Sequence, residues 1–281
     1  MFVWTRDTGA ARKSQITALA LTALFFGLSF FTSVNLWPQR ANVYEHAKSS
    51  TMLVSTPTSW GSGVVVERNS TSGRRVFLWT AAHVVIDSPT TVKTKIIFRD
   101  GSGCKAGEGT FDADLLGISP ELDLALYWVH VPDSMVTDVK FAEDGPQPIG
   151  SEIFHVGNFL GPRFDNSLTR GIVSQHNLNP NEPGWLWPVA DQADLAVIPG
   201  GSGGGVFRNS DGAVIGLMVA GLGQTSVTAF VPNRTIHAWA NQTGLGFAFA
   251  GDLCPTDSVL NQAVAVAKAE HEIIRLFVLP P

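Results

Sequence analysis

The order of apolar and polar positions divides the chain into three parts. An apolar run without charge occupies residues 16–37, short apolar segments with turn residues between them follow from Trp60, and helical periodicity is confined to the C-terminal part. Short segments of this kind predict strands, and the lack of helical patterns between them favours antiparallel barrels over a parallel sheet. Strands are predicted at Gly61–Val66, Arg75–Thr80, Thr94–Phe98, Asp123–Val131, Glu152–Val156, Leu168–Ser174, Trp185–Val189, Gly205–Arg208, Val214–Val219 and Thr228–Val231, and helices at Thr235–Gln242 and about Thr256–Phe277.

The apolar run at the N-terminus predicts a membrane-spanning helix. Ile16–Trp37 contains no charged residue, and at about 1.5 Å per residue a helix of this length crosses a hydrocarbon core of roughly 30 Å. Residues 1–14 are mainly basic in their charge, which predicts that they stay in the cytoplasm. We expect a signal anchor at residues 15–37 followed by a linker at 38–58, and a cleaved signal peptide is the alternative.

Composition limits the function classes. The 281 residues are 44% hydrophobic, enough for one large domain or two small ones. The net charge of −5 and the lack of a basic run exclude a nucleic-acid surface. Cys104 and Cys254 lie far apart, so a disulfide between them and two free thiols are both compatible with the sequence. Residues 246–281 are expected to form a helical extension.

A glycine-rich run carries the first candidate for chemistry. Five of the nine residues in Val197–Gly205 are glycine, and Ser202 stands among them. A tight turn of this kind places a hydroxyl beside bare backbone N–H groups, which is what acyl transfer needs in a nucleophile and its oxyanion donors. Taken alone, the run is more typical of a surface loop, so its interpretation depends on finding a base and a carboxylate elsewhere.

Both partners occur upstream in suitable contexts. His83 follows a predicted buried strand, and Asp123 begins an otherwise apolar one. A lone histidine there is usually structural, but a buried carboxylate needs a partner, and an imidazole N–H is a suitable one. His83, Asp123 and Ser202 therefore form a candidate set of base, orienting carboxylate and nucleophile.

These segments together resemble the trypsin-like serine peptidases of the chymotrypsin fold, and among them the HtrA/Deg branch. The resemblance covers about residues 60–240 and implies a peptidase domain at 59–245, all-β, with two six-stranded antiparallel β-barrels. It is carried by Thr80-Ala81-Ala82-His83, Asp123-Leu124-Ala125-Leu126 and Gly200-Gly201-Ser202-Gly203-Gly204, with further matches at Gly61–Val65, Val156–Asn158, Thr169–Ser174, Asp194, Pro199 and Val214–Gly216.

The resemblance assigns a role to each residue of the set. Ser202 would be the nucleophile, His83 the general base and then acid, and Asp123 the group that fixes the imidazole tautomer. The N–H groups of Gly200 and Ser202 would form the oxyanion hole. Protein or peptide substrates are implied, with no cofactor. His130, His155 and His176 have no regular ligand spacing, so we interpret them as structural or surface residues and expect no metal site.

The sequence departs from the family at two points. Gly201 stands where digestive members have an aspartate and HtrA-like members usually an asparagine, so pairing of a new N-terminus with that aspartate is excluded. The adjacent glycines predict a disordered resting oxyanion loop. The stretch after residue 240 is too short for a PDZ domain, and an oligomer is compatible with the sequence but not readable from it.

The resemblance also implies a specificity pocket without charge. Its floor at Ala196 lacks the carboxylate of trypsin-like specificity, which favours cleavage after small or medium apolar residues. Phe230 would narrow the pocket further. The residues expected to bind substrate are Ala196, Val197, Pro199, Val219 and Gly221.

The favoured hypothesis is a serine endopeptidase anchored to a membrane, with its catalytic domain outside the cytoplasm. One alternative is a secreted form released by signal-peptide cleavage. Another is a binding or scaffold protein that keeps the fold without turnover, although such a protein would not need an intact set of catalytic residues. A different hydrolase or acyl-transfer chemistry at the same site is the third, because fold and site do not determine the substrate.

Overall fold

The computed structural model describes residues 43–70, 73–99, 105–131, 139–143, 145–178, 190–221, 223, 225–249 and 254–278. Val43–Pro281 forms one compact unit, and the other unit, Met1–Asn42, lies outside the described residues. The predicted anchor at residues 15–37 therefore lies outside them as well. Among the helices that the structure describes, none is long and apolar enough to cross a membrane.

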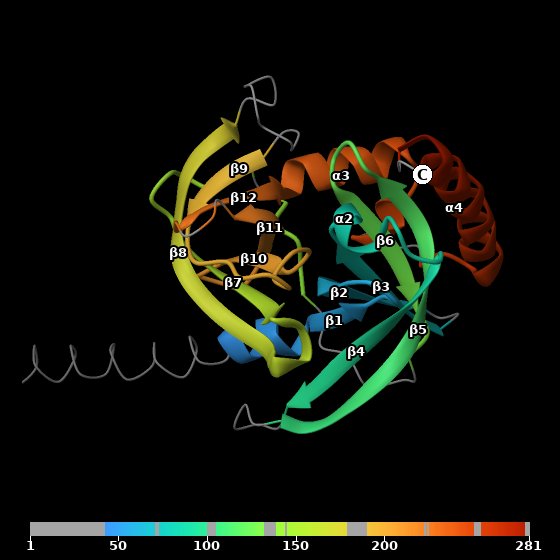
Figure 1. The fold of residues 1–281 in the computed structure, drawn as a ribbon, viewed down its shortest axis with the longest axis horizontal. Helices are drawn as coiled ribbons and strands as arrows, with labels where there is room; N and C mark the ends of the chain where they lie inside the picture. Colours follow the sequence, from blue (N-terminus) through green and yellow to red (C-terminus); the bar gives the residue numbers. More distant parts are fainter. Residues whose placement is uncertain are drawn as a thin grey trace, which may run out of the picture. The chain divides into compact units, whose positions relative to one another are not determined.

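The first six strands close into an antiparallel barrel in the order β1-β2-β3-β6-β5-β4 (Figure 1). Closure depends on β1, which pairs with β2 on one side and with β4 on the other, with Leu53 opposite both Ser62 and Lys95. The strands are β1 (Thr51–Ser55), β2 (Trp60–Ser70), β3 (Gly73–Thr80), β4 (Thr91–Arg99), β5 (Lys105–Ser119) and β6 (Leu124–Val129).

The remaining six strands close into a second antiparallel barrel in the order β10-β11-β12-β9-β8-β7. The strands are β7 (Glu152–Phe159), β8 (Phe164–Leu178), β9 (Ala190–Asp194), β10 (Gly205–Arg208), β11 (Val214–Gly221) and β12 (Val227–Pro232). The prediction of two six-stranded antiparallel barrels is therefore confirmed. The glycine-rich run lies in the loop between β9 and β10.

Strand β7 contributes to two different cores. Its side chains alternate, because successive residues of a strand point to opposite faces. Phe154 and Val156 lie in a large apolar cluster that also contains Trp79 and Leu126 of the first barrel. Ile153 points the other way, into a smaller cluster inside the second barrel. His155 lies on the same face of β7 as Ile153, so it also points into the second barrel.

The helices pack on the barrels at their ends and flanks. They are α2 (Ala82–Val85), α3 (Asn233–Gln242) and α4 (Asp257–Val278), with short 3-10 turns η1 (Gly161–Arg163) and η2 (Gly246–Ala248), and residues 43–49 are also helical. Helix α4 buries Leu260, Val264 and Ala267, and it lies against β5. Its buried His271 donates from Nε2 to the carbonyl of Ile86 at 3.0 Å, directly after α2.

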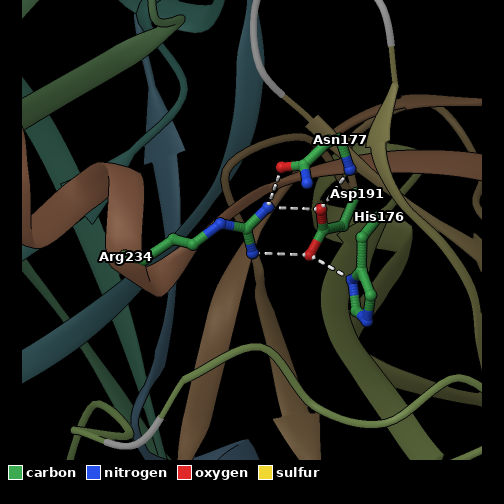
Figure 2. Close-up of polar contacts among 4 residues, drawn as sticks. All are labelled: His176, Asn177, Asp191 and Arg234. Carbon is green, nitrogen blue, oxygen red and sulfur yellow. Dashed lines mark hydrogen bonds and ion pairs between the residues drawn. The ribbon is translucent and has the colours of Figure 1, made fainter.

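A buried carboxylate fastens α3 to the second barrel. Asp191 of β9 accepts hydrogen bonds from both terminal nitrogens of Arg234 on α3, at 2.6 and 2.8 Å (Figure 2). The same carboxylate accepts from His176 Nδ1 at 2.9 Å and from the Asn177 N–H at 3.0 Å. Burial alone would raise the pKa of Asp191, but the hydrogen bonds from Arg234, Asn177 and His176 outweigh burial and hold the pKa below its usual value.

The structure differs from the sequence analysis at several elements. Residues 51–55 were expected in a linker at 38–58 but form β1, whose first four residues are buried. No strand was predicted at Lys105–Ser119, because charged residues and glycines interrupt the apolar pattern of β5. The strand predicted at 185–189 lies outside the described residues, and β9 begins at Ala190.

Candidate active site

Asp123 and His83 form a pair in which both carboxylate oxygens contact the same residue. Asp123 Oδ2 lies 2.7 Å from His83 Nδ1, and Oδ1 accepts the main-chain N–H of His83 at 2.8 Å. The aspartate side chain is 7% exposed and the imidazole is 45% exposed. Because a carboxylate only accepts, Nδ1 carries the proton, so Nε2 of the neutral imidazole is a free base on the exposed side of the pair.

Local backbone geometry sets up this pair. Asp123 has a φ of 52°, a left-handed conformation that aspartate adopts more readily than most residues, at the turn between β5 and β6. His83 lies in α2, directly after β3. Strands β3 and β6 are neighbours in the first barrel, with Thr80 opposite Ala125, so their ends bring the two side chains together.

Ser202 lies in a tight turn at residues 200–204, hereafter the serine turn. Gly201 N–H donates to the Ile198 carbonyl at 2.9 Å, and Gly204 N–H donates to the Gly201 carbonyl at 3.0 Å. The N–H of Gly203 donates to the Met218 carbonyl at 2.7 Å, which ties the turn to β11. Gly201, Gly203 and Gly204 are thus each held by a backbone hydrogen bond.

A group of polar side chains clasps the serine turn to the first barrel. Ser62 Oγ donates to the Gly200 carbonyl at 2.6 Å and accepts the N–H of Asn158 at 2.7 Å. Ser62 also donates its own N–H to the Ser202 carbonyl at 2.8 Å. Thr80 Oγ1 completes the clasp by donating to the Ser62 carbonyl at 2.7 Å. These roles were missed in the sequence, although Ser62 and Asn158 stand in the segments that carry the family resemblance.

The serine turn also lies close to the histidine segment. A Cβ placed on Gly203 would lie 2.8 Å from the main-chain nitrogen of Ala81, two residues before His83. Among the hydrogen bonds of the described residues, none joins Ser202 Oγ to the imidazole. The structure thus brings the nucleophile candidate to the same end of the barrels as the His83–Asp123 pair, without a direct hydrogen bond between them.

The backbone around Gly200 leaves its N–H free of internal acceptors. Gly200 has a φ of 96°, a conformation that favours glycine. The preceding carbonyl of Pro199 accepts the Leu160 N–H at 2.7 Å and so points away from the turn. Within the described part of the chain, the N–H groups of Gly200 and Ser202 donate to no acceptor. The turn therefore holds two unused donors on either side of Gly201.

The expected substrate-binding residues fall into two groups. Val197 lies between the serine turn and Gly221: its Cγ2 would be 3.0 Å from a Cβ on Gly201, and its Cγ1 would overlap a Cβ on Gly221. Ala196 and Pro199 are exposed beside it. Val219 is buried in the large apolar cluster, and Phe230, which was expected to narrow the pocket, lies in the core of the second barrel.

The described residues contain no cluster of metal-ligating side chains. His130 and His176 are each paired with one aspartate, Asp114 and Asp191 respectively. Cys254 Sγ contacts the Arg68 carbonyl at 3.8 Å, whereas Cys104, its suggested disulfide partner, lies outside the described residues.

Comparison with known proteins places these motifs in a family. A family model described as a trypsin-like peptidase domain matches residues 61–217, more than half of the chain. The HtrA-like serine protease of Staphylococcus aureus is 34% identical over 174 residues, which is 59% of this chain and 21% of that protein. The chain thus spans about a fifth of the length of the curated relatives it matches.

Solved structures share the fold at low identity. Deg5 superposes with a TM-score of 0.55 at 19% identity, over 76% of this chain and 97% of that chain. The Rv3671c protease from M. tuberculosis, in its inactive form, gives 0.55 at 20% identity, over 72% of this chain and 92% of that chain. The HtrA-type protease AlgW, solved with a tripeptide, gives 0.57 at 23% identity, over 73% and 63%. The chain belongs to the trypsin-like peptidase family, and within it the chain is similar to HtrA-like serine proteases.

Proposed function

We propose that this protein is a serine endopeptidase in which Ser202, His83 and Asp123 act as nucleophile, base and orienting carboxylate. The observation that carries the proposal is the His83–Asp123 pair, in which one buried carboxylate binds both the N–H and the Nδ1 of the same histidine. This arrangement fixes the tautomer that leaves Nε2 unprotonated, as a general base requires.

The reaction would proceed by covalent catalysis. Nε2 of His83 takes the proton of Ser202 Oγ as the oxygen attacks the scissile carbonyl, and the imidazolium is stabilised by Asp123. His83 then gives the proton to the leaving amine. In the second half of the reaction His83 takes a proton from water as the water attacks the acyl-enzyme, and it returns this proton to Ser202 Oγ. In enzymes without bound substrate the hydrogen bond between nucleophile and base is often long, and it shortens when substrate binds. The lack of a direct Ser202–His83 hydrogen bond is therefore compatible with this mechanism.

The free N–H groups of Gly200 and Ser202 would form the oxyanion hole. Their donors lie in a turn already held by Ser62, Leu160 and Met218, so little reorganisation is needed when negative charge develops on the carbonyl oxygen. In comparable enzymes the loss of one such donor lowers kcat by roughly 10²–10³-fold.

The proposed substrates carry a small or medium apolar residue before the scissile bond. Val197 occupies space beside Gly221 and the serine turn, and no acidic side chain stands at Ala196. A Lys or Arg side chain would lose hydration there without gaining an ion pair, whereas each buried methylene of an apolar side chain contributes about 0.8 kcal/mol.

The proposed location is the outer side of a membrane. This part of the proposal rests on the uncharged run Ile16–Trp37 and the basic residues before it. The substrates would then be extracytoplasmic proteins or peptides, held close to the membrane surface.

The test is covalent labelling of the full-length protein with a fluorophosphonate, beside cleavage of a peptide library. We expect a stoichiometric adduct on Ser202 in the wild type and no adduct or cleavage in Ser202→Ala or His83→Ala. Labelling at another residue, or turnover by Ser202→Ala, contradicts the mechanism. A wild type that binds peptides but is never labelled would support the alternative of a catalytically silent scaffold.

A further inference from the structure

His155 is a fully buried histidine directly beneath the serine turn. It lies in β7, on the face that points into the second barrel, and is 0% exposed. Its Nδ1 lies 2.9 Å from the carbonyl of Gly205, the residue that follows the turn. Since a carbonyl only accepts, Nδ1 carries the proton and donates this hydrogen bond. Nε2 is then an acceptor, and among the described residues it has no partner.

Glycines form the walls around this imidazole. A Cβ on Gly201 or on Gly157 would lie 2.9 Å from His155 Nε2, and a Cβ on Gly204 would lie 2.7 Å from its Cε1. These distances are shorter than real side-chain contacts allow, so the ring occupies the space that side chains at these positions would need. Two glycines of the serine turn are thus explained by the histidine that packs under them.

The imidazole is uncharged in this position. Burial lowers its pKa to about 4, and the Gly205 carbonyl opposes this only in part. Thr169 of β8, which is paired with His155, has no charge. The next residue, Arg170, forms an ion pair with Glu152 and lies over the ring of Tyr44. Phe159 lies beside the ring, with the ring centroids 5.6 Å apart, and among the described residues no charged group contributes to the shift of its pKa.

A buried polar nitrogen without a partner destabilises a fold, and an apolar side chain of similar volume would avoid this cost. Packing alone could therefore be provided by an apolar side chain, and the N–H of the histidine is what such a side chain would lack. What distinguishes His155 from an apolar residue is its bond to Gly205, at the point where the serine turn enters β10. That bond and the contact with Gly201 hold the turn from both of its ends.

We propose that His155 is a positioning residue for the serine turn, which holds Gly201 and Gly205 so that the Gly200 and Ser202 N–H groups stay directed at the substrate. The inference rests on the proposed function, because the purpose of the positioning is the oxyanion hole. His155 itself touches no reacting atom. It acts on the rate of acylation through the backbone and not through substrate binding.

The decisive variants are His155→Ala, His155→Asn and Gly201→Ala. Alanine removes both the hydrogen bond to Gly205 and the volume of the imidazole ring. The side-chain N–H of asparagine is as many bonds from Cα as Nδ1 of histidine, so asparagine restores the hydrogen bond to Gly205. In Gly201→Ala the new methyl collides with Nε2, and the double variant Gly201→Ala/His155→Ala relieves that collision. His130→Ala is the matched control, since His130 is exposed and contacts Asp114 far from the turn.

We expect His155→Ala to lower kcat by roughly tenfold or more with KM changed by less than about threefold, because the oxyanion donors act mainly in the transition state. His155→Asn should recover most of this loss. The double variant should be more active than the product of the two single effects predicts. His130→Ala should match the wild type.

Hydrogen exchange supplies a readout that does not depend on activity. Exchange of the Gly203 and Gly204 amides, which donate to Met218 and Gly201, should be faster in His155→Ala by about tenfold and near the wild-type rate in His155→Asn. If exchange and kcat are both unchanged in a folded His155→Ala protein, the positioning role is wrong. The proposed function still holds in that case, provided that the wild type is labelled by the fluorophosphonate. If the wild type is not labelled, the proposed function fails, and the exchange result alone decides whether His155 holds the turn.

Discussion

At the scale of single residues, the orientation of the His83 imidazole depends on one carboxylate. Both groups that Asp123 contacts are N–H donors of His83, so the site requires an acceptor at each oxygen. An amide offers one acceptor and one donor, and its N–H would face another N–H or force the imidazole into the opposite tautomer.

We therefore predict that Asp123→Asn lowers kcat by roughly 10³–10⁴-fold while the fold is retained. The measurement is kcat on an apolar peptide substrate, with thermal unfolding as the check on folding. Asp114→Asn is the matched control, because Asp114 also pairs with a histidine, His130, but at the exposed side of the first barrel. Wild-type turnover by Asp123→Asn would exclude Asp123 from the mechanism.

Val197 is the second residue whose effect can be isolated. Its side chain stands between the serine turn and Gly221, so Val197→Ala should enlarge the pocket. We compare peptide substrates that differ only in the residue before the scissile bond. The kcat/KM of a Leu or Phe substrate, divided by that of the Ala substrate, should rise by about tenfold, which is the discrimination typical of one or two methylene groups. Ile198→Ala, at an exposed neighbour, should leave the ratio unchanged. A wild-type preference for Arg or Lys would refute the pocket assignment.

At the scale of elements, the second barrel and α3 are held together by Asp191 (Figure 2). Its carboxylate is 3% exposed and binds Arg234, His176 and Asn177 at once. Asp191 and Arg234 are 43 residues apart along the chain, so the contact between β9 and α3 is purely tertiary. Removal of the charge leaves Arg234 without its buried partner.

Asp191→Asn should lower the free energy of unfolding by about 3 kcal/mol or more at neutral pH. The folded-state pKa of Asp191 is lowered, so its contribution is present above the unfolded value near 3.9 and is lost as pH falls below it. The difference between wild type and Asp191→Asn should therefore shrink in acid. Denaturant titrations at several pH values measure this difference. Asp211→Asn is the control: Asp211 forms a partly exposed ion pair with Arg208, and its substitution should lower the free energy of unfolding by about 1 kcal/mol or less. An equal difference at all pH values would contradict the role of the Asp191 charge.

At the scale of the whole molecule, the prediction concerns attachment to a membrane. Val43–Pro281 is a compact unit, and the apolar run precedes it. We expect the full-length protein to stay in the membrane fraction after a carbonate wash and a chain beginning at Val43 to be released by it. Protease added from the outside should reach the barrels. A soluble mature form that begins near residues 35–45 would instead support signal-peptide cleavage.

The local pattern of the sequence was sufficient to predict antiparallel barrels, although it missed β1 and β5. Strand alternation and turn residues act over a few positions, so the antiparallel barrels and the helix at Asp257–Val278 could be inferred without tertiary information. His83, Asp123 and Ser202 could be selected from the sequence because three short motifs, taken together, carry the family resemblance. The structure joins His83 to Asp123 by hydrogen bonds.

The closure of the barrels and the support of the serine turn were decided by tertiary structure. The pattern placed β1 in a linker, and this segment is stable as a strand because β2 and β4 pair with both of its edges. The clasp from Ser62 to Gly200 spans 138 residues, and the contact of His155 with Gly205 spans 50. A histidine in a strand and a glycine in a loop have no shared signal in sequence; only folding brings the imidazole into the space that Gly201 leaves open.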